Sequence, residues 1–344
     1  MSTTERNIHL GVLGAAVAVA VWVFGAQPRA GGLATRGDTH STETEPRSPL
    51  ALIPPSSAFI LSVDVRALAG APLGAFLAER LGRSAGASKL AETCGFDPLL
   101  RLDQLALSIP TANLGADAHP DFGVIANGRF TAAEITRCAS TAINARGGEA
   151  VRSKLDSFDT VRDRNGSSGE IAAKDGLVVV SGGSYFRELL NAAEGGLQNL
   201  AQRSARGLQH ADLRHALGPG PLLATWLLGE GWFERVAGSD ANARLSPLSA
   251  LKRLGARVKV TDTAQLLLLL ECTDSAGAER VATLLHELQS SLDVLPIDPA
   301  LRAIAKRITV SQREARLSLE LELTRAELSP VLAALDPEST AGSP

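Results

Sequence analysis

The sequence predicts an α+β fold of two similar β-α-β-β-α-β-β-α halves with mainly antiparallel sheets, preceded by an N-terminal transmembrane or signal helix. Three observations lead to this prediction. Apolar and polar residues alternate in short runs such as Leu317–Leu323 (LSLELEL), which is the period of a half-buried strand. These runs come in consecutive pairs joined by short turns, which favours antiparallel pairing. The order of strand-like and helix-like runs repeats after about 140 residues, which indicates an internal duplication.

The first apolar segment, residues 10–26, contains no charged side chain and follows a short N-terminal tail of residues 1–9. A membrane-spanning helix needs about 17–25 residues, whereas the apolar part of a cleavable signal has about 7–15. The segment therefore fits an uncleaved single-span anchor better than a cleaved signal. We expect an inner-membrane, single-pass protein with its C-terminal part in the periplasm. The alternative is secretion to the periplasm after signal cleavage.

The segment after the anchor is rich in Gly, Thr, Ser and Glu and has no apolar period, which is typical of a disordered linker. It separates the anchor from the folded part of the chain. The predicted organisation beyond residue 26 is a linker at 27–49, a first α+β half at 50–195, a connecting segment at 196–218, a second α+β half at 219–336 and a disordered tail at 337–344.

The first half begins with a strand that follows Pro54 and Pro55, a position where no ladder donor is needed. Thr131 followed by Glu134 is a capping box and marks the start of a later helix. We expect, in order, a strand at 57–65, a helix within 66–83, strands at 104–109 and 122–127, a helix at 131–144, strands at 169–173 and 177–181, and a helix at 184–194.

The second half repeats this order. We expect a strand at 221–229, a short helix at 230–238, a hairpin of 250–261 with 263–272, a helix capped by Asp274 or Ser275, a hairpin within 305–323, and a final helix that starts with the capping box of Thr324 and Glu327. The run Leu266–Leu270 has no alternation, so we expect a central strand covered on both faces. Elsewhere the alternating strands favour helices on one face of each sheet.

The three cysteines are Cys94, Cys138 and Cys272, and none forms a CxxC pair, which argues against structural zinc and thioredoxin chemistry. In an oxidising compartment Cys94 and Cys138 either form a disulfide or stay as free thiols, and the sequence leaves both alternatives open. Cys272 ends the leucine-rich strand, so we expect a buried, inert thiol.

Composition and motifs argue against several functions. The net charge is −3 and aromatic residues make up 4% of the chain, so neither a basic face nor stacked rings favour a nucleic-acid partner. The chain carries no G-x-S-x-G, Walker A or H-E-x-x-H motif, and these motifs mark common hydrolase, nucleotide and zinc sites. We therefore predict no enzyme activity, no catalytic residue, no cofactor and no metal.

A few residues have a functional interpretation as well as a structural one. Asp64 and Asp97 stand at a strand end and in a turn, where carboxylates act as acid and base or cap helices and turns. His210, Asp212 and His215 form the one cluster of potential metal ligands, but histidines five apart diverge on a helix. His286 is expected at a core edge or surface. The remaining candidates are two small-residue turns, Gly166–Gly169 and Ser181–Ser184, of which the second precedes Arg187 and has an anion site as its alternative.

Residues 52–190 carry a resemblance. They contain a proline-led strand that ends in SVDV, the stretch Cys94–Pro98 (CGFDP) before another strand, and a helix that carries Cys138. In this order they resemble uncharacterised exported or envelope proteins of GC-rich Gram-negative bacteria. The resemblance implies an exported α+β protein and transfers no catalytic residue.

The leading hypothesis is therefore a membrane-tethered extracytoplasmic protein that acts as a non-catalytic binding or structural envelope module. Its expected partners are the membrane, through residues 10–26, and an envelope protein, not a nucleic acid. One alternative is a periplasmic module that binds a small or apolar ligand between the two halves. Another is a hydrolase with a carboxylate site around Asp64 and Asp97.

Overall fold

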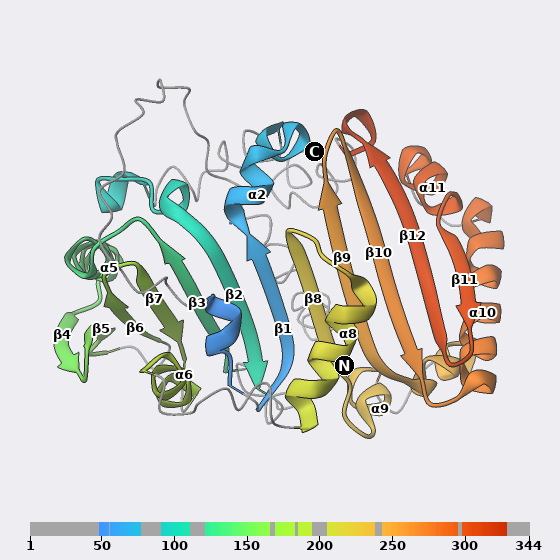
Figure 1. Cartoon of the computed structure of the whole chain (residues 1–344), viewed down its shortest axis with the longest axis horizontal. Coiled ribbons are helices and arrows are strands. Elements are labelled where there is room, and N and C mark those ends of the chain that lie inside the picture. Colours follow the sequence, from blue (N-terminus) through green and yellow to red (C-terminus); the bar gives the residue numbers. More distant parts are fainter. Residues whose placement is uncertain are drawn as a thin grey trace. The chain divides into compact units, whose positions relative to one another are not determined.

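The computed structural model divides the chain into two compact units, residues 1–70 with 74–208 and residues 71–73 with 209–344. The structure describes residues 48–54, 56–76, 91–110, 121–165, 169–182, 185–194, 205–237, 243–294 and 298–328 (Figure 1). The predicted anchor at 10–26, most of the linker and the tail at 337–344 lie outside these ranges. Among the helices that the structure describes, none has the length and apolar character needed to cross a membrane.

The first unit is built on an antiparallel sheet. Its strands are ordered β1-β2-β3-β7-β6-β5-β4. Its elements are η1 (Pro49–Leu52), β1 (Ser57–Asp64), α2 (Val65–Gly70), η2 (Leu99–Arg101), β2 (Leu102–Pro110), β3 (Gly123–Gly128), α5 (Ala132–Ala145), β4 (Ala150–Leu155), β5 (Phe158–Asp163), β6 (Glu170–Lys174), β7 (Leu177–Ser181) and α6 (Tyr185–Glu194).

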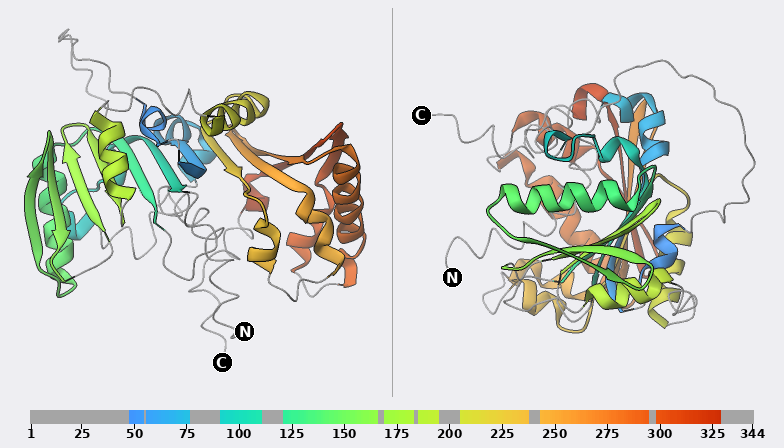
Figure 2. Two further views of the ribbon diagram at one scale, coloured as in Figure 1. Left: turned by 90° about the horizontal axis from the view of Figure 1, so that it is seen from below. Right: turned by 90° about the vertical axis from the view of Figure 1, so that its left-hand side faces the viewer.

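Helices cover both faces of this sheet, so the expectation of helices on one face was wrong. On one face Arg152 of β4 donates from Nε to Ser140 Oγ of α5 at 2.9 Å. On the other, Ile125 and Val179 pack against the buried side chains of α6. Figure 2 shows the outer strands of the sheet between α5 and α6. The physical reason lies in strands such as β6, where the successive residues Ala172 and Ala173 point to opposite faces of the sheet and are both buried, so the strand needs cover on both sides.

The second unit has a five-stranded antiparallel sheet ordered β8-β9-β10-β12-β11. It includes the part of α8 (Ala205–Leu217) from Gln209 onward. Its other elements are β8 (Leu222–Leu227), α9 (Trp232–Ala237), η4 (Ala243–Ala250), β9 (Leu251–Val260), β10 (Thr263–Cys272), α10 (Ser275–Ser290), η5 (Leu292–Val294), α11 (Pro299–Lys306), β11 (Thr309–Arg313) and β12 (Arg316–Thr324).

The leucine-rich strand β10 is covered on both faces in its second half. Leu269 packs with Leu213 and Leu217 of α8, whereas the next residue, Leu270, packs in a separate cluster with the buried apolar side chains of α10. The prediction of a doubly covered strand is confirmed there. It is wrong near the start of the strand, where Leu266 belongs to neither cluster and is 37% exposed.

Local signals placed several helix ends correctly. The predicted capping box is present at α5, where Thr131 N–H donates to Glu134 Oε2 at 2.9 Å and Glu134 N–H donates to Thr131 Oγ1 at 3.2 Å. At α10 the cap is Asp274, which accepts from Gly277 N–H at 2.6 Å. The sequence analysis did not predict the β4–β5 hairpin, α11 or the 3-10 helices η1, η2, η4 and η5. The first unit therefore has one hairpin more than the predicted element order.

Candidate functional site

The structure joins Cys94 and Cys138 in a disulfide with their Cα atoms 4.3 Å apart. The link ties the segment before η2 to the middle of α5. Cys272 is a free, buried cysteine, and burial raises the pKa of its thiol above the usual value. A buried thiol that is kept protonated is a poor nucleophile, which agrees with the inert role expected for Cys272.

The two candidate acid–base carboxylates act as caps. Asp64 Oδ1 accepts from Ala67 N–H at 2.8 Å at the start of α2. Asp97 Oδ1 accepts from Leu100 N–H at 3.4 Å at the start of η2. These contacts match the structural alternative, in which an aspartate satisfies an orphan N–H of the first turn.

The structure separates the histidine cluster. His210 is 2% exposed, and its Nδ1 lies 2.7 Å from Thr225 Oγ1 on β8. Asp212 and His215 lie on exposed parts of the same helix. In the part of the chain that the structure describes, no group of three or more His, Cys, Asp or Glu side chains is placed to hold a metal ion.

The two small-residue turns are described only in part, since residues 166–168 and 183–184 lie outside the described ranges. Ser181 is fully buried, and its Oγ donates to the carbonyl of Phe122 at 2.7 Å. This contact holds the end of β7 next to the start of β3. Ser181, the only hydroxyl residue of these two turns that the structure describes, therefore has a structural role.

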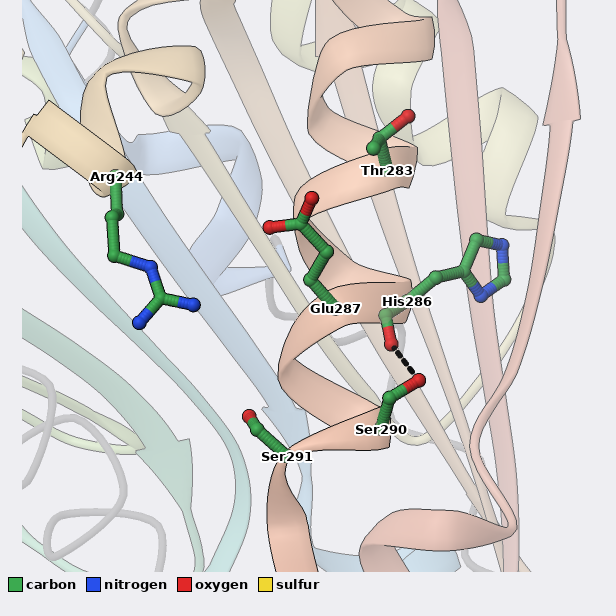
Figure 3. Close-up of a pocket in the computed structure, with 6 residues that line it drawn as sticks. All are labelled: Arg244, Thr283, His286, Glu287, Ser290 and Ser291. Atoms are coloured by element: carbon green, nitrogen blue, oxygen red, sulfur yellow. Dashed lines mark hydrogen bonds between the residues drawn. The ribbon is translucent and has the colours of Figure 1, made fainter.

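A depression of about 550 Å³ lies on the outer side of α10, and His286 is among its lining residues (Figure 3). Its hydroxyls are used within the helix, because Thr283, Ser290 and Ser291 each donate to a carbonyl one turn earlier. In Figure 3 the Glu287 carboxylate points toward the side of Arg244, whereas the His286 ring points away from it. The depression is lined by Arg244, Thr283, His286, Glu287, Ser290 and Ser291.

A second depression, of about 640 Å³, involves β9, β10 and β12. Several of its polar groups are already paired with one another. Arg307 forms an ion pair with Glu327, and Glu322 accepts from Thr263 Oγ1 at 2.7 Å. The charged side chains that line it are two arginines and three glutamates, so the net charge is only −1; they are Arg257, Arg307, Glu320, Glu322 and Glu327.

The opposite end of the same sheet carries a different arrangement, which we call the arginine row. It consists of Arg253, Glu271, Arg316 and Arg313, which lie side by side on β9, β10, β12 and β11 through three successive cross-strand pairs. Glu271 forms an ion pair with Arg253 and lies 3.6 Å from Arg316, measured from Oε2 to Nε. Arg313 directly opposes Arg316, and its side chain forms no ion pair or hydrogen bond with any described residue.

The arginine row holds three positive charges against one carboxylate. Arg253 and Glu271 are largely buried, with side chains 19% and 16% exposed, whereas the Arg316 side chain is 47% exposed. Like charges directly opposite each other on a sheet are destabilising. The row therefore carries two more positive than negative charges, and its member at the edge of the sheet, Arg313, has no described carboxylate partner.

The sequence could not predict this row, because its members are spread over some sixty residues and become neighbours only through strand register. The available signal was the pair of arginines around the Glu314–Ala315 turn, whose meaning depends on knowing that the two strands pair.

Comparisons of the chain with protein-family models, curated proteins and solved structures find no match.

Proposed function

We propose that this chain is a non-catalytic binding module of the cell envelope, anchored in the inner membrane by residues 10–26 with its C-terminal part in the periplasm. The observation that carries the location is the disulfide between Cys94 and Cys138, because such bonds persist in oxidising compartments and are rare in the cytosol. The length and composition of residues 10–26 support an anchor over a cleaved signal.

Binding rather than catalysis is supported by how the polar side chains are used. Asp64 and Asp97 cap helical turns, and the hydroxyls of the α10 depression bond to their own helix. In the arginine row, by contrast, one carboxylate serves three arginines, and the Arg313 side chain has no ion pair with a described residue. A surface with unbalanced charge favours association with an oppositely charged partner.

We also infer that the two units descend from one duplicated module. The strand order β1-β2-β3-β7-β6 of the first unit corresponds, strand for strand, to β8-β9-β10-β12-β11 of the second. In both units a long helix, α5 or α10, follows the third strand. The β4–β5 hairpin is then an addition at the outer edge of the first sheet.

A fusion of alkaline phosphatase behind Ser48, expressed in a Gram-negative host, tests the location. We expect active enzyme that stays with the membranes after alkaline washing. The matched control carries Val17→Arg and Val21→Arg, since each arginine in a spanning helix costs about 2.5–3.5 kcal/mol of insertion energy; this control should be inactive. An intact but inactive fusion without these changes would refute the proposed location.

A further inference from the structure

We propose that β11 binds an extended acidic peptide, which joins the sheet as an additional strand and places a carboxylate against Arg313. This inference rests on the proposed binding function and names its partner class. It is carried by two independent features of the second unit: the free backbone groups of the edge strand β11 and the excess positive charge of the arginine row.

The first feature is the free edge of the sheet. In the described residues β11 pairs with β12 alone and ends the strand order. A two-residue turn, Glu314–Ala315, joins the two strands, so Arg313 and Arg316 form the hydrogen-bonded pair next to the turn. The alternation then directs the N–H and C=O groups of Val310 and Gln312 away from β12. No described residue forms a hydrogen bond to these groups, so they can pair with an incoming strand.

The second feature is the charge beside that edge. Arg313 is exposed and opposes Arg316, and the single carboxylate of the row, Glu271, is already shared between Arg253 and Arg316. Glu314 in the turn forms no ion pair with a described residue, and counting it still leaves three positive charges against two. An added strand lies about 4.8 Å from β11, which brings its side chain opposite Arg313 within reach of the guanidinium.

A second copy of this chain fits the edge less well than an acidic peptide. Two β11 strands that pair about a two-fold axis at Ser311 align Val310 with Gln312, which satisfies the backbone. Arg313 would then oppose the uncharged Thr309 of the second copy, so the excess charge remains. Such a contact would also join only five residues on each side, far less than the 20–30 residues per side of about 800 Å² that a stable interface uses.

The test measures binding of a fluorescein-labelled peptide, in which Glu alternates with Val and Thr, to the full chain in detergent by fluorescence anisotropy. The reference peptide has Gln in place of Glu. We expect the acidic peptide to bind at least tenfold more tightly than the reference peptide and to weaken as salt rises. Arg313→Glu should abolish this preference without lowering the thermal midpoint, because it places opposite charges at the Arg313–Arg316 pair. Arg137→Glu, the same charge change on an exposed position of α5, is the matched control and should bind normally.

The backbone contact is tested separately. Val310→Pro removes an outward N–H that the β11–β12 ladder does not use, and we expect at least a tenfold loss of affinity, whereas Val310→Ala should bind within about threefold of the unmodified chain. If the proline variant fails to fold, an acidic peptide with alternate amides N-methylated gives the same information on the unmodified protein, and it should not bind.

Several outcomes would overturn the inference: equal binding of the acidic and Gln peptides, unchanged binding by Arg313→Glu, or full binding of the N-methylated peptide. Binding of anionic lipid vesicles without binding of the peptide, or a dimer that Val310→Pro disrupts while the peptide never binds, would also overturn it. The outcome of the phosphatase fusion experiment does not depend on any of these results. Failure of this inference is therefore distinguishable from failure of the proposed membrane-tethered location.

Discussion

At the scale of the residue, Tyr185 is the single tyrosine of the chain and lies in the core of the first unit, 2% exposed. Its hydroxyl lies 2.8 Å from Ser57 Oγ and donates to Ser108 Oγ at 3.1 Å. Burial is the main cause that raises the pKa of Tyr185 above its usual value. A raised pKa in the folded state means that the contribution of this group to stability is present below the unfolded pKa of about 10 and is lost at higher pH.

We therefore expect that Tyr185 ionises only at a pH clearly above that of free tyrosine, together with loss of the fold. Ultraviolet absorbance titration isolates this group, because the chain has no other tyrosine, and circular dichroism reports the fold in parallel. Tyr185→Phe is the control without a tyrosinate signal. Ionisation near pH 10 with an intact fold would contradict the burial of this hydroxyl.

Glu134 supports a prediction in the acid range. Its carboxylate accepts from the Thr131 N–H and from Arg101 Nη1 at 2.8 Å, and these bonds lower the pKa of Glu134 from 4.5 to about 2, the backbone bond being the larger cause. A depressed pKa gives stability that is present above the unfolded pKa and is lost as the pH falls toward 2. We expect the thermal midpoint of the unmodified chain to fall more steeply between pH 4.5 and pH 2 than that of Glu134→Gln. Parallel curves over this interval would contradict the capping role of the ionised carboxylate.

At the scale of the element, β12 and β10 supply a matched pair of leucines. Leu317 is fully buried in the cluster beneath α10, whereas Leu266 is 37% exposed. Leu317→Ala should lower the free energy of unfolding by about 2–5 kcal/mol, and Leu266→Ala by much less, because the cost follows the cavity left in a packed core. Denaturant unfolding followed by tryptophan fluorescence measures this, since Trp226 and Trp232 both lie in the second unit. Equal losses for the two variants would contradict the burial difference.

The elements also show which patterns a sequence can predict. Strict alternation predicted β12, whose Leu317 and Leu323 are buried while Glu320 and Glu322 are exposed. The hairpin of β4 and β5 escaped prediction because β4 lies at an edge and has no buried residue, so its side chains carry no apolar period. Helices on both faces were missed because a strand such as β6, with successive buried residues, requires a cover on each face, and its own sequence does not say which helices supply them.

At the scale of the whole molecule, the sequence predicted the order of the elements but not the register in which the strands pair. The order of elements suggested two related halves, and the corresponding strand orders of the two units are consistent with that proposal. The candidate binding site was beyond such reasoning. Arg253 and Arg316 are distant in sequence and meet at Glu271 only because three strands pair in one register. Charged residues that are distant in the sequence become one cluster only when the strands that carry them pair.

The proposed periplasmic location of the molecule is supported most directly by the state of its cysteines. The denatured, unreduced chain should react with thiol reagents at one site, Cys272, and after reduction at all three cysteines. Cross-linking residues 44 apart restricts the unfolded chain, and this contributes about 3–4 kcal/mol in the loop-closure model. Reductant should therefore lower the thermal midpoint of the unmodified chain and leave that of the Cys94→Ser, Cys138→Ser double variant unchanged. Three reactive thiols in the unreduced chain would show that the Cys94–Cys138 bond does not form. The proposed periplasmic location would then lose the observation that supports it.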